Sequence, residues 1–220
     1  MRRPEQRTDR RLKVDMHTHC DASPDSATPV EVQAVAIRKA KLDVVCATDH
    51  NTIEGAVRLR EIADGFRVIV GEEIRSADGE IIGLFLDRVV PPDLSAEDTI
   101  ARIKEQGGLV VVPHPFSPTR PRPLLRTVLD RLWPQIDALE VLNGRKEFPA
   151  DNAKAAEYAR ERGIPGTAGS DAHRASDIGR AFVEVAEFAS AEELRQALRT
   201  GSVRRRSTFV RDLLGQQGPR

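Results

Sequence analysis

The chain has 220 residues, which is enough for one substantial hydrophobic core. Its 34 lysine and arginine residues balance 34 aspartate and glutamate residues, so no net charge draws it toward nucleic acid or an anionic membrane. We expect a single domain whose partners are recognised at local sites, with no membrane partner and with a nucleotide, rather than nucleic acid, left open as a ligand.

The two cysteines, Cys20 and Cys46, are too few for a disulfide framework and form no Cys-x-x-Cys pair. No apolar stretch approaches the roughly 20 residues that span a bilayer, and residues 1–11 carry charge without a following apolar signal core. We therefore expect a soluble cytoplasmic protein.

Short β-rich runs alternate along the chain with segments that carry helix-start signals. The predicted strands are Leu12–His17, Asp43–Thr48, Arg67–Glu73, Glu80–Leu86, Leu109–Pro113, Ile136–Leu142, Gly166–Gly169 and Ala181–Val185. Such alternation is typical of βα units around a largely parallel sheet or barrel. In these folds, functional residues collect where the strands end.

Helix starts are marked between the strands. Thr28-Pro29-Val30-Glu31 offers a capping residue, a proline at the first helical position and a glutamate three residues after the cap, before a run to Lys41. Further starts lie at Thr52, Ser95 and Ser190, and further ends at Gly107-Gly108 and Gly201.

The domain boundaries follow from these elements. We expect one domain over residues 12–210, with flexible tails at 1–11 and 211–220. Residues 117–123 contain three prolines and predict an extended loop over the edge of the site. The run Arg204-Arg205-Arg206 is expected near the surface.

All five histidines lie in short polar strings at the ends of predicted strands. They are His17, His19, His50, His114 and His173. His17 and His19 are two residues apart, where alternate side chains of a strand point to the same face, and Asp171 and His173 repeat this spacing. The pattern predicts one metal centre assembled from distant segments, and therefore an enzyme.

Each string also has a purely structural interpretation. A lone His-x-His pair occurs by coincidence, Asp25 lies in a string that suits a turn, and His114 between two prolines suits packing. Glu72 and Glu73 are adjacent on a strand, so only one of them can face the site. The joint placement of every histidine at a strand end is what favours the metal centre.

Taken together, these strings resemble the PHP family, named for polymerase and histidinol phosphatase. The resemblance rests on Asp15-x-His17-x-His19, Ser23-Pro24-Asp25-Ser26, Ala47-Thr48-Asp49-His50-Asn51, Gly71-x-Glu73, Pro113-His114-Pro115 and Gly169-Ser170-Asp171-Ala172-His173. It covers about residues 12 to 185. It implies an α/β fold, a distorted seven-stranded (β/α) barrel of the TIM type, with two or three metal ions and hydrolysis of phosphate esters.

The resemblance also implies a ligand set. One metal would take His17, His19, Glu73 and Asp171, a second would share Glu73 and add His114, and a third would use Asp25, His50 and His173. Mixed histidine and carboxylate ligands suit Zn, Mn or Fe without choosing among them.

One position departs from the family pattern. Members with three metals usually carry a further histidine at the start of the strand after Gly-x-Glu, where this chain has Glu80. Either Glu80 binds metal as a hard oxygen ligand, or it is the exposed first residue of a strand. The second metal site depends on which of these holds.

The expected reaction is hydrolysis of a phosphomonoester by a metal-activated water. Asp49 or His50 would protonate the leaving oxygen. The candidates for binding phosphate are Arg145, Arg120, Arg122 and Arg174. A small phosphorylated metabolite, histidinol phosphate and a nucleotide all stay open as the substrate, and the sequence does not determine the oligomeric state.

Three other functions compete with this one. An exonuclease or phosphodiesterase would favour a basic groove, which the balanced charge and 4% aromatic content argue against. A protein-tyrosine phosphatase would use the same chemistry on another substrate. A non-catalytic, metal-stabilised binding module would follow if Glu80 in place of histidine had abolished turnover.

Overall fold

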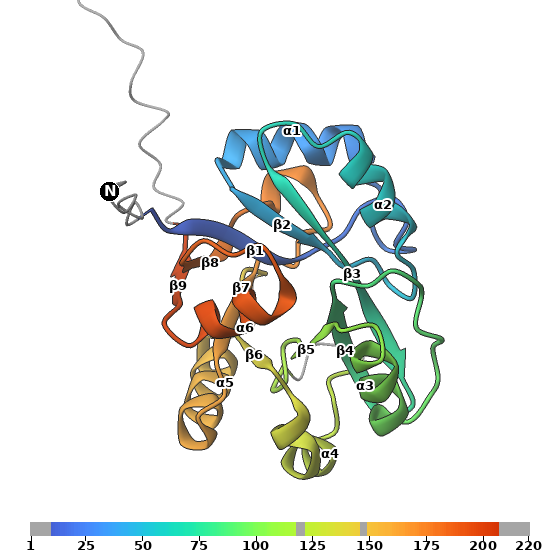
Figure 1. Cartoon of the computed structure of the whole chain (residues 1–220), viewed down its shortest axis with the longest axis vertical. Helices are drawn as coiled ribbons and strands as arrows, with labels where there is room; N and C mark the ends of the chain where they lie inside the picture. The colour runs from blue at the N-terminus through green and yellow to red at the C-terminus, as the bar shows by residue number, and fades with distance from the viewer. Residues whose placement is uncertain (1–9, 118–121, 146–148, 207–220) are drawn as a thin grey trace, which may run out of the picture.

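The structure is a computed structural model that describes residues 10–117, 122–145 and 149–206. Within these residues, nine strands form one sheet, with six α-helices around it (Figure 1). The strands are β1 (Leu12–Thr18), β2 (Val44–Ala47), β3 (Arg67–Ser76), β4 (Gly79–Leu84), β5 (Leu109–Val112), β6 (Ala138–Asn143), β7 (Gly166–Gly169), β8 (Ala181–Val185) and β9 (Ser202–Arg205). The helices are α1 (Val30–Ala40), α2 (Glu54–Glu61), α3 (Ala96–Lys104), α4 (Arg126–Leu132), α5 (Pro149–Arg162) and α6 (Ala191–Leu198).

The sheet curls into a nearly closed barrel, which confirms the predicted α/β barrel class. Its strand order is β7-β6-β5-β4-β3-β2-β1-β8-β9. Beyond β7, the N–H of Asp171 donates to the carbonyl of His17 (2.8 Å), and the N–H of His19 donates to the carbonyl of Ala172 (3.0 Å). The segment after β7 therefore meets the end of β1. This contact brings Asp171 and His173 beside His17 and His19.

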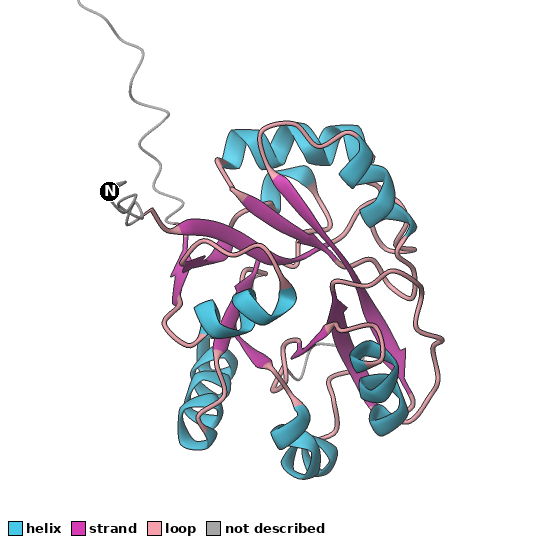
Figure 2. Ribbon diagram, viewed as in Figure 1, coloured by secondary structure: helices cyan, strands magenta, loops and turns pink. Residues whose placement is uncertain are grey.

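The sheet is less parallel than the alternation of elements predicts. Among the described strands, the pairs β1–β2, β2–β3, β5–β6 and β6–β7 are parallel, whereas β3–β4, β4–β5, β1–β8 and β8–β9 are antiparallel. The reason is that β4 returns directly beside β3 without a helix between them, and β8 and β9 add to the β1 edge (Figure 2). β8 and β9 also raise the strand number above the seven implied by the resemblance.

The β3–β4 hairpin brings Glu80 to the rim of the barrel. Gly79 has a φ of +130°, and a Cβ at this position would lie 2.5 Å from Cα of Leu124. Only glycine allows this close approach. A hydrogen bond holds the hairpin against the segment before α4, because the N–H of Glu80 donates to the carbonyl of Arg122 (2.9 Å).

Helix starts follow the predicted capping chemistry at Ser95 and Ser190, which are the residues before α3 and α6. Thr52 lies one residue too early, because Ile53 is the residue that precedes α2. The hydroxyls of Ser95, Ser190 and Thr52 accept from N–H groups two or three residues later, at 3.1 to 3.2 Å. The prediction for Thr28 is wrong. Pro29 is the residue that precedes α1, and the Thr28 hydroxyl instead donates to the carbonyl of His173 (3.1 Å), which ties the loop before α1 to the site.

The barrel interior is filled below the site by apolar strand residues. Val14, Val44 and Val111 pack there against Leu194 and Leu198 of α6, which closes this end of the barrel (Figure 1). Two further cores lie outside the sheet, one under α1 and α2 and the other under α3, α4 and α5. Each fully buried Val or Leu stabilises the fold by roughly 1.5–3 kcal/mol. This apolar packing offsets the cost of burying the polar residues at the other end of the barrel.

The chain ends are described only in part. Of the predicted tail 1–11, Arg10 and Arg11 are described, and Arg11 Nη2 donates to the carbonyls of Glu184 (2.9 Å) and Thr200 (2.5 Å). The exposed position predicted for Arg204–Arg206 is confirmed. Residues 211–220 and most of the loop predicted over 117–123 lie outside the described residues. No described helix combines the length and apolar character needed to cross a bilayer.

Candidate metal centre

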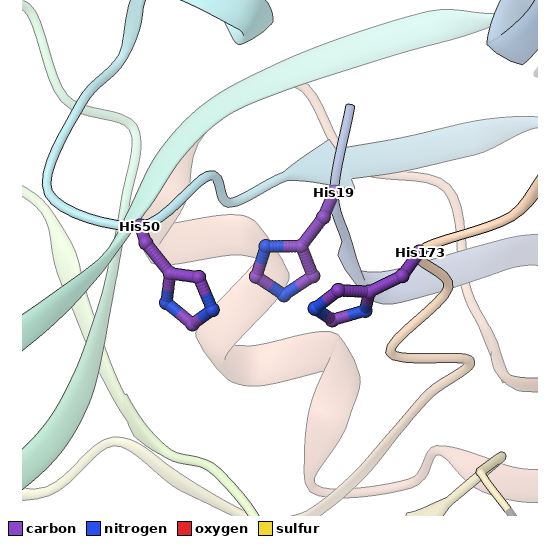
Figure 3. A group of neighbouring side chains, drawn as sticks. All are labelled: His19, His50 and His173. Atoms are coloured by element: carbon purple, nitrogen blue, oxygen red, sulfur yellow. The ribbon is translucent and has the colours of Figure 1, made fainter. Parts of the chain in front are cut away.

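The five histidines converge at one end of the barrel. His17 lies on β1 and His19 just after it, while His50, His114 and His173 follow β2, β5 and β7. Figure 3 shows the rings of His19, His50 and His173 pointing toward one another. The ring centroids of His19 and His173 are 4.2 Å apart, and those of His19 and His50 are 4.6 Å apart. The predicted convergence of distant segments is therefore what the fold produces.

An irregularity in β1 includes His17, the first of the histidines. The pairing of β1 with β2 shifts register between Asp15 and Thr18. Irregularities of this kind re-aim side chains next to active sites. Nε2 of His17 and Nε2 of His19 lie 3.0 Å apart, and Oε2 of Glu73 is 3.3 Å from each.

The carboxylates complete the cluster. Asp171 Oδ1 lies 3.8 Å from Nε2 of His17 and 3.6 Å from Nε2 of His19. Asp25 Oδ2 lies 2.9 Å from Nε2 of His173. Asp25 thus belongs to the cluster and is not only a turn residue.

His50 and His114 contact the two oxygens of Glu73 from opposite sides. Nδ1 of His50 is 3.2 Å from Oε2 of Glu73, and Nε2 of His114 is 3.1 Å from Oε1. Glu73 is thereby placed at the centre, as the bridging role implied by the family resemblance requires. Its neighbour Glu72 points the other way, with Oε2 accepting from the N–H of Val90 (2.9 Å), as the strand geometry predicts.

The structure decides between the two interpretations of Glu80. Its exposed fraction is only 8%, and its Oε2 lies 3.8 Å from Nε2 of His114. The interpretation as an exposed strand residue is wrong, because the hairpin turns this side chain inward. Glu80 forms a potential ligand group with Glu73 and His114.

Potential metal-binding groups overlap throughout the cluster. Four sets of three donors have ligand atoms within 4.8 Å of one another, namely His19–His50–His173, His17–His19–Glu73, His17–His114–Asp171 and Glu73–Glu80–His114. Imidazole nitrogens and carboxylate oxygens are the donors that divalent transition metals use in proteins. The residues present therefore fit the divalent ions that the family resemblance implies.

The electrostatics of the cluster reflect burial opposed by neighbouring charges. Burial lowers the pKa of His19 to about 4. Burial and then the neighbouring Glu73 raise the pKa of Glu80 to about 7. For Glu73, burial opposes ionisation, but His17 and three histidine hydrogen bonds hold its pKa well below its usual range. The charge on each buried carboxylate or imidazole therefore depends on the charges of its neighbours in the cluster.

Glu140 is a site residue that the sequence analysis missed. Its Oε1 is 3.2 Å from Nδ1 of His17, and its Oε2 accepts from the N–H of His114 (2.8 Å). A carboxylate behind a ligating histidine fixes the ring and its tautomer. The available signal was a glutamate in the middle of the otherwise apolar strand β6.

Asn143 at the end of β6 was also missed. Its amide Nδ2 donates to Glu140 (2.9 Å) and to Oδ2 of Asp171 (3.0 Å), while its Oδ1 accepts from the N–H of Arg145 (2.9 Å). One buried amide therefore orients three groups. They are the potential ligand Asp171, the carboxylate of Glu140 behind His17, and the backbone of Arg145 at the start of the next loop.

Asp49, one of the two candidates for the leaving-group acid, lies behind the cluster. Its Oδ1 accepts from the N–H of Cys20 and from the hydroxyl of Ser23, both at 2.7 Å, and its Oδ2 accepts from Sγ of Cys20 (3.0 Å). The Ser23 hydroxyl also lies 3.0 Å from Nδ1 of His19. With both oxygens engaged, Asp49 positions the loop behind His19 and is poorly placed to protonate a leaving group.

The predicted phosphate-binding arginines differ in placement. Arg145 Nη1 lies 3.3 Å from Nδ1 of His173 and 3.6 Å from Oδ1 of Asp171, with 39% of the side chain exposed. Arg122 and Arg174 are exposed. Arg120 lies outside the described residues. Arg145 is thus the candidate with described contacts to the cluster.

Comparison with known proteins agrees with this geometry. A family model described as PHP-associated matches residues 149–203. An uncharacterized protein of Methanocaldococcus jannaschii, MJ1587, is 40% identical over 146 residues, which are 60% of this chain and 82% of the relative. A second one, MJ0417, is 34% identical over 181 residues, covering 80% of this chain and 72% of the relative.

The fold is shared with a solved structure. A two-domain protein from Bacteroides vulgatus, containing a predicted PHP-like metal-dependent phosphoesterase, superposes with a TM-score of 0.72 at 22% identity. The match covers 88% of this chain, and the chain spans 64% of the length of that protein.

Fold and site together define an α/β-barrel protein with a buried histidine–carboxylate cluster suited to divalent metals. The chain belongs to the PHP family, as its likeness to PHP-like proteins in sequence and fold shows.

Proposed function

We propose that this protein is a metal-dependent phosphomonoesterase that acts on a small phosphorylated metabolite or nucleotide. The observation that carries the proposal is a largely buried cluster of five histidines and four carboxylates with a cation, Arg145, at its exposed side. The ligands would be His17, His19, Asp25, His50, Glu73, Glu80, His114, Asp171 and His173. Two or three divalent ions, of Mn, Zn or Fe, suit this number of donors.

Substrate would reach the cluster from the side of Asp25 and His50. Their side chains are 51% and 21% exposed, whereas those of His17, Glu73 and His114 are almost fully buried. Divalent ions held here supply an activated water and stabilise the charge that develops on phosphoryl oxygens. The recessed cluster favours a terminal phosphate group, which reaches a buried centre more easily than a group in the middle of a polymer.

Arg145 would bind the phosphate. Its guanidinium lies beside His173 and Asp171, and its backbone is held by Asn143, so it is already positioned when substrate arrives. A planar fork of donors suits phosphate oxygens. His50 has carboxylates at both ring nitrogens, with Asp25 3.4 Å from Nε2, and this favours the role of ligand over that of leaving-group acid.

The protein would work in the cytoplasm. Both cysteines are free and buried, which fits a reducing compartment.

The test of the proposal is phosphate release before and after removal of metal. The protein is stripped with a chelator, reloaded with Mn²⁺ or Zn²⁺, and assayed against phosphorylated metabolites, nucleotides, a phosphodiester and a phosphotyrosine peptide. We expect metal-dependent release from monoesters and loss of release in His17→Ala and Asp171→Ala. Unchanged activity in these two variants, or none on any phosphate ester, would contradict the proposal.

Arg145→Ala supplies a finer prediction. Loss of one charge-assisted contact to phosphate is expected to cost about 1.5–3 kcal/mol of binding, or roughly tenfold or more in KM, with less effect on kcat. Steady-state kinetics on the best monoester measure both constants. Arg160→Ala, which removes an exposed arginine from α5, is the matched control and should leave KM unchanged.

A further inference from the structure

The two ends of the cluster differ in donor chemistry. At one end, His19, His50 and His173 offer three imidazole nitrogens within 4.8 Å of one another. At the other end, Glu73, Glu80 and His114 offer two carboxylate oxygens and one imidazole nitrogen within the same limit. The first group is rich in nitrogen and the second in oxygen.

The oxygen-rich end is closed and held rigidly. The side chains of Glu73 and His114 are 1% and 3% exposed, and Glu80 is buried at the start of β4. The backbone of Glu80 is fixed by its hydrogen bond to Arg122, and Gly79 allows the hairpin to approach this closely.

Two buried carboxylates at this end share one imidazole as a neighbour. Glu80 and Glu73 both lie against Nε2 of His114, at 3.8 and 3.1 Å. Like charges close together in a buried site repel, even where each carboxylate has an imidazole beside it. A divalent cation bound by both oxygens offsets that repulsion.

Donor type decides which cation binds most favourably at each end. Imidazole suits zinc, whereas carboxylate oxygens suit harder ions such as manganese. We propose that the cluster is heterometallic, with Mn²⁺ at the Glu73–Glu80–His114 end and Zn²⁺ at the His19–His50–His173 end, and that Glu80 determines this selectivity. The inference rests on the proposed function, because it takes the cluster to be a metal centre.

The test is the metal content of the full chain loaded with both ions. Stripped protein is dialysed against a buffer that holds free Mn²⁺ in large excess over free Zn²⁺, since zinc binds most nitrogen and oxygen sites more tightly. Bound metals are then counted by mass spectrometry, and bound Mn²⁺ is identified by its electron paramagnetic resonance spectrum. We expect the unaltered chain to retain both metals.

Variants at Glu80 separate the donor effect from a loss of folding. Glu80→His is expected to lose the manganese equivalent and gain zinc, and Glu80→Gln to lose manganese without gaining zinc. Glu61→His adds an imidazole on the exposed surface of α2 and should leave the metal content unchanged. Circular dichroism reports whether each variant folds. If Glu80→His does not fold, the manganese content of Glu80→Gln is the deciding measurement.

The outcomes distinguish this inference from the proposed function. Zinc alone at every free-metal ratio, or the same manganese content in the unaltered chain and both Glu80 variants, would overturn the heterometallic assignment while leaving a metal-dependent phosphatase intact. Absence of any bound metal would instead overturn the proposed function.

Discussion

Asn143 shows how one uncharged side chain can organise a charged site. It is 1% exposed, and its amide contacts Glu140, Asp171 and the backbone of Arg145. Its Nδ2 group donates to both carboxylates, so each acid has a fixed partner that carries no charge. The same side chain therefore links a potential metal ligand to the residue proposed to bind phosphate.

Asn143→Asp is expected to weaken metal binding. The substitution keeps the shape but replaces the amide donor with an oxygen that faces two carboxylates, which then repel it. Loss of a partner behind metal ligands typically costs about 10–100-fold in metal affinity. Competition with a metal-chelating dye measures the affinity, and thermal unfolding checks the fold. An affinity within twofold of the unaltered chain would show that Asn143 does not position Asp171.

The residues that could be predicted from the sequence are those in strings of unusual composition. His17, His50, Asp171 and the others stand where apolar strands end, so their convergence follows from the fold. Glu140 and Asn143 belong to a strand whose partners are distant in sequence, and only the fold brings them behind His17 and Asp171. The contacts of Asp49 with Cys20 and Ser23 could not be predicted, because spacing does not reveal that the loop after β1 folds back on it.

At the scale of elements, one acid joins α4 to α5 beside their shared apolar core. Asp130 on α4 accepts from the hydroxyl of Tyr158 (2.9 Å), from Arg162 (3.1 Å) and from Arg126 (2.8 Å). Burial and the bond to Asp130 raise the pKa of Tyr158 to about 12. The protonated phenol is the form that donates to Asp130 and holds the two helices together.

Because Tyr158 is the only tyrosine in the chain, its titration can be followed directly. We expect a midpoint near pH 12 in the folded protein and about 10 in urea, measured by absorbance at 295 nm. A raised pKa means that the contribution to stability is complete below pH 10 and is lost as the pH rises toward 12. A folded midpoint equal to the unfolded one would contradict the contact with Asp130.

Most strands could be predicted because apolar runs are bounded by turn residues. The exceptions have physical causes. β9 is a short edge strand with three exposed residues at its end, so it carries no apolar signal. The antiparallel return of β4 depends on how closely Gly79 can approach Leu124, and the bond from Thr28 to His173 is a long-range contact that outweighs local capping.

At the scale of the whole molecule, the cluster joins the ends of several strands. Residues from β1, β3 and β4 and from the loops after β1, β2, β5 and β7 contribute to it, so bound ions would cross-link most of the barrel. Several of these residues are carboxylates buried close to one another, and bound cations would offset their repulsion.

Removal of metal should therefore lower the thermal stability. Free metal at 100 times its Kd stabilises the folded state by about 2.7 kcal/mol per site, which for a chain of this size corresponds to roughly 5–10 °C in Tm. Differential scanning calorimetry with and without chelator measures the change. A Tm that is the same in both conditions would mean that the cluster holds no ion under those conditions.

The most direct test of the central claim is the rate of phosphate release as a function of the number of ions bound per chain. Stripped protein is titrated with metal, and bound metal and phosphate release from the best monoester are measured on the same samples. We expect no release at zero occupancy and a rise to a plateau at two or three ions per chain. Full activity in the stripped protein, or no activity on any phosphate ester at full occupancy, would contradict metal-dependent phosphoester hydrolysis.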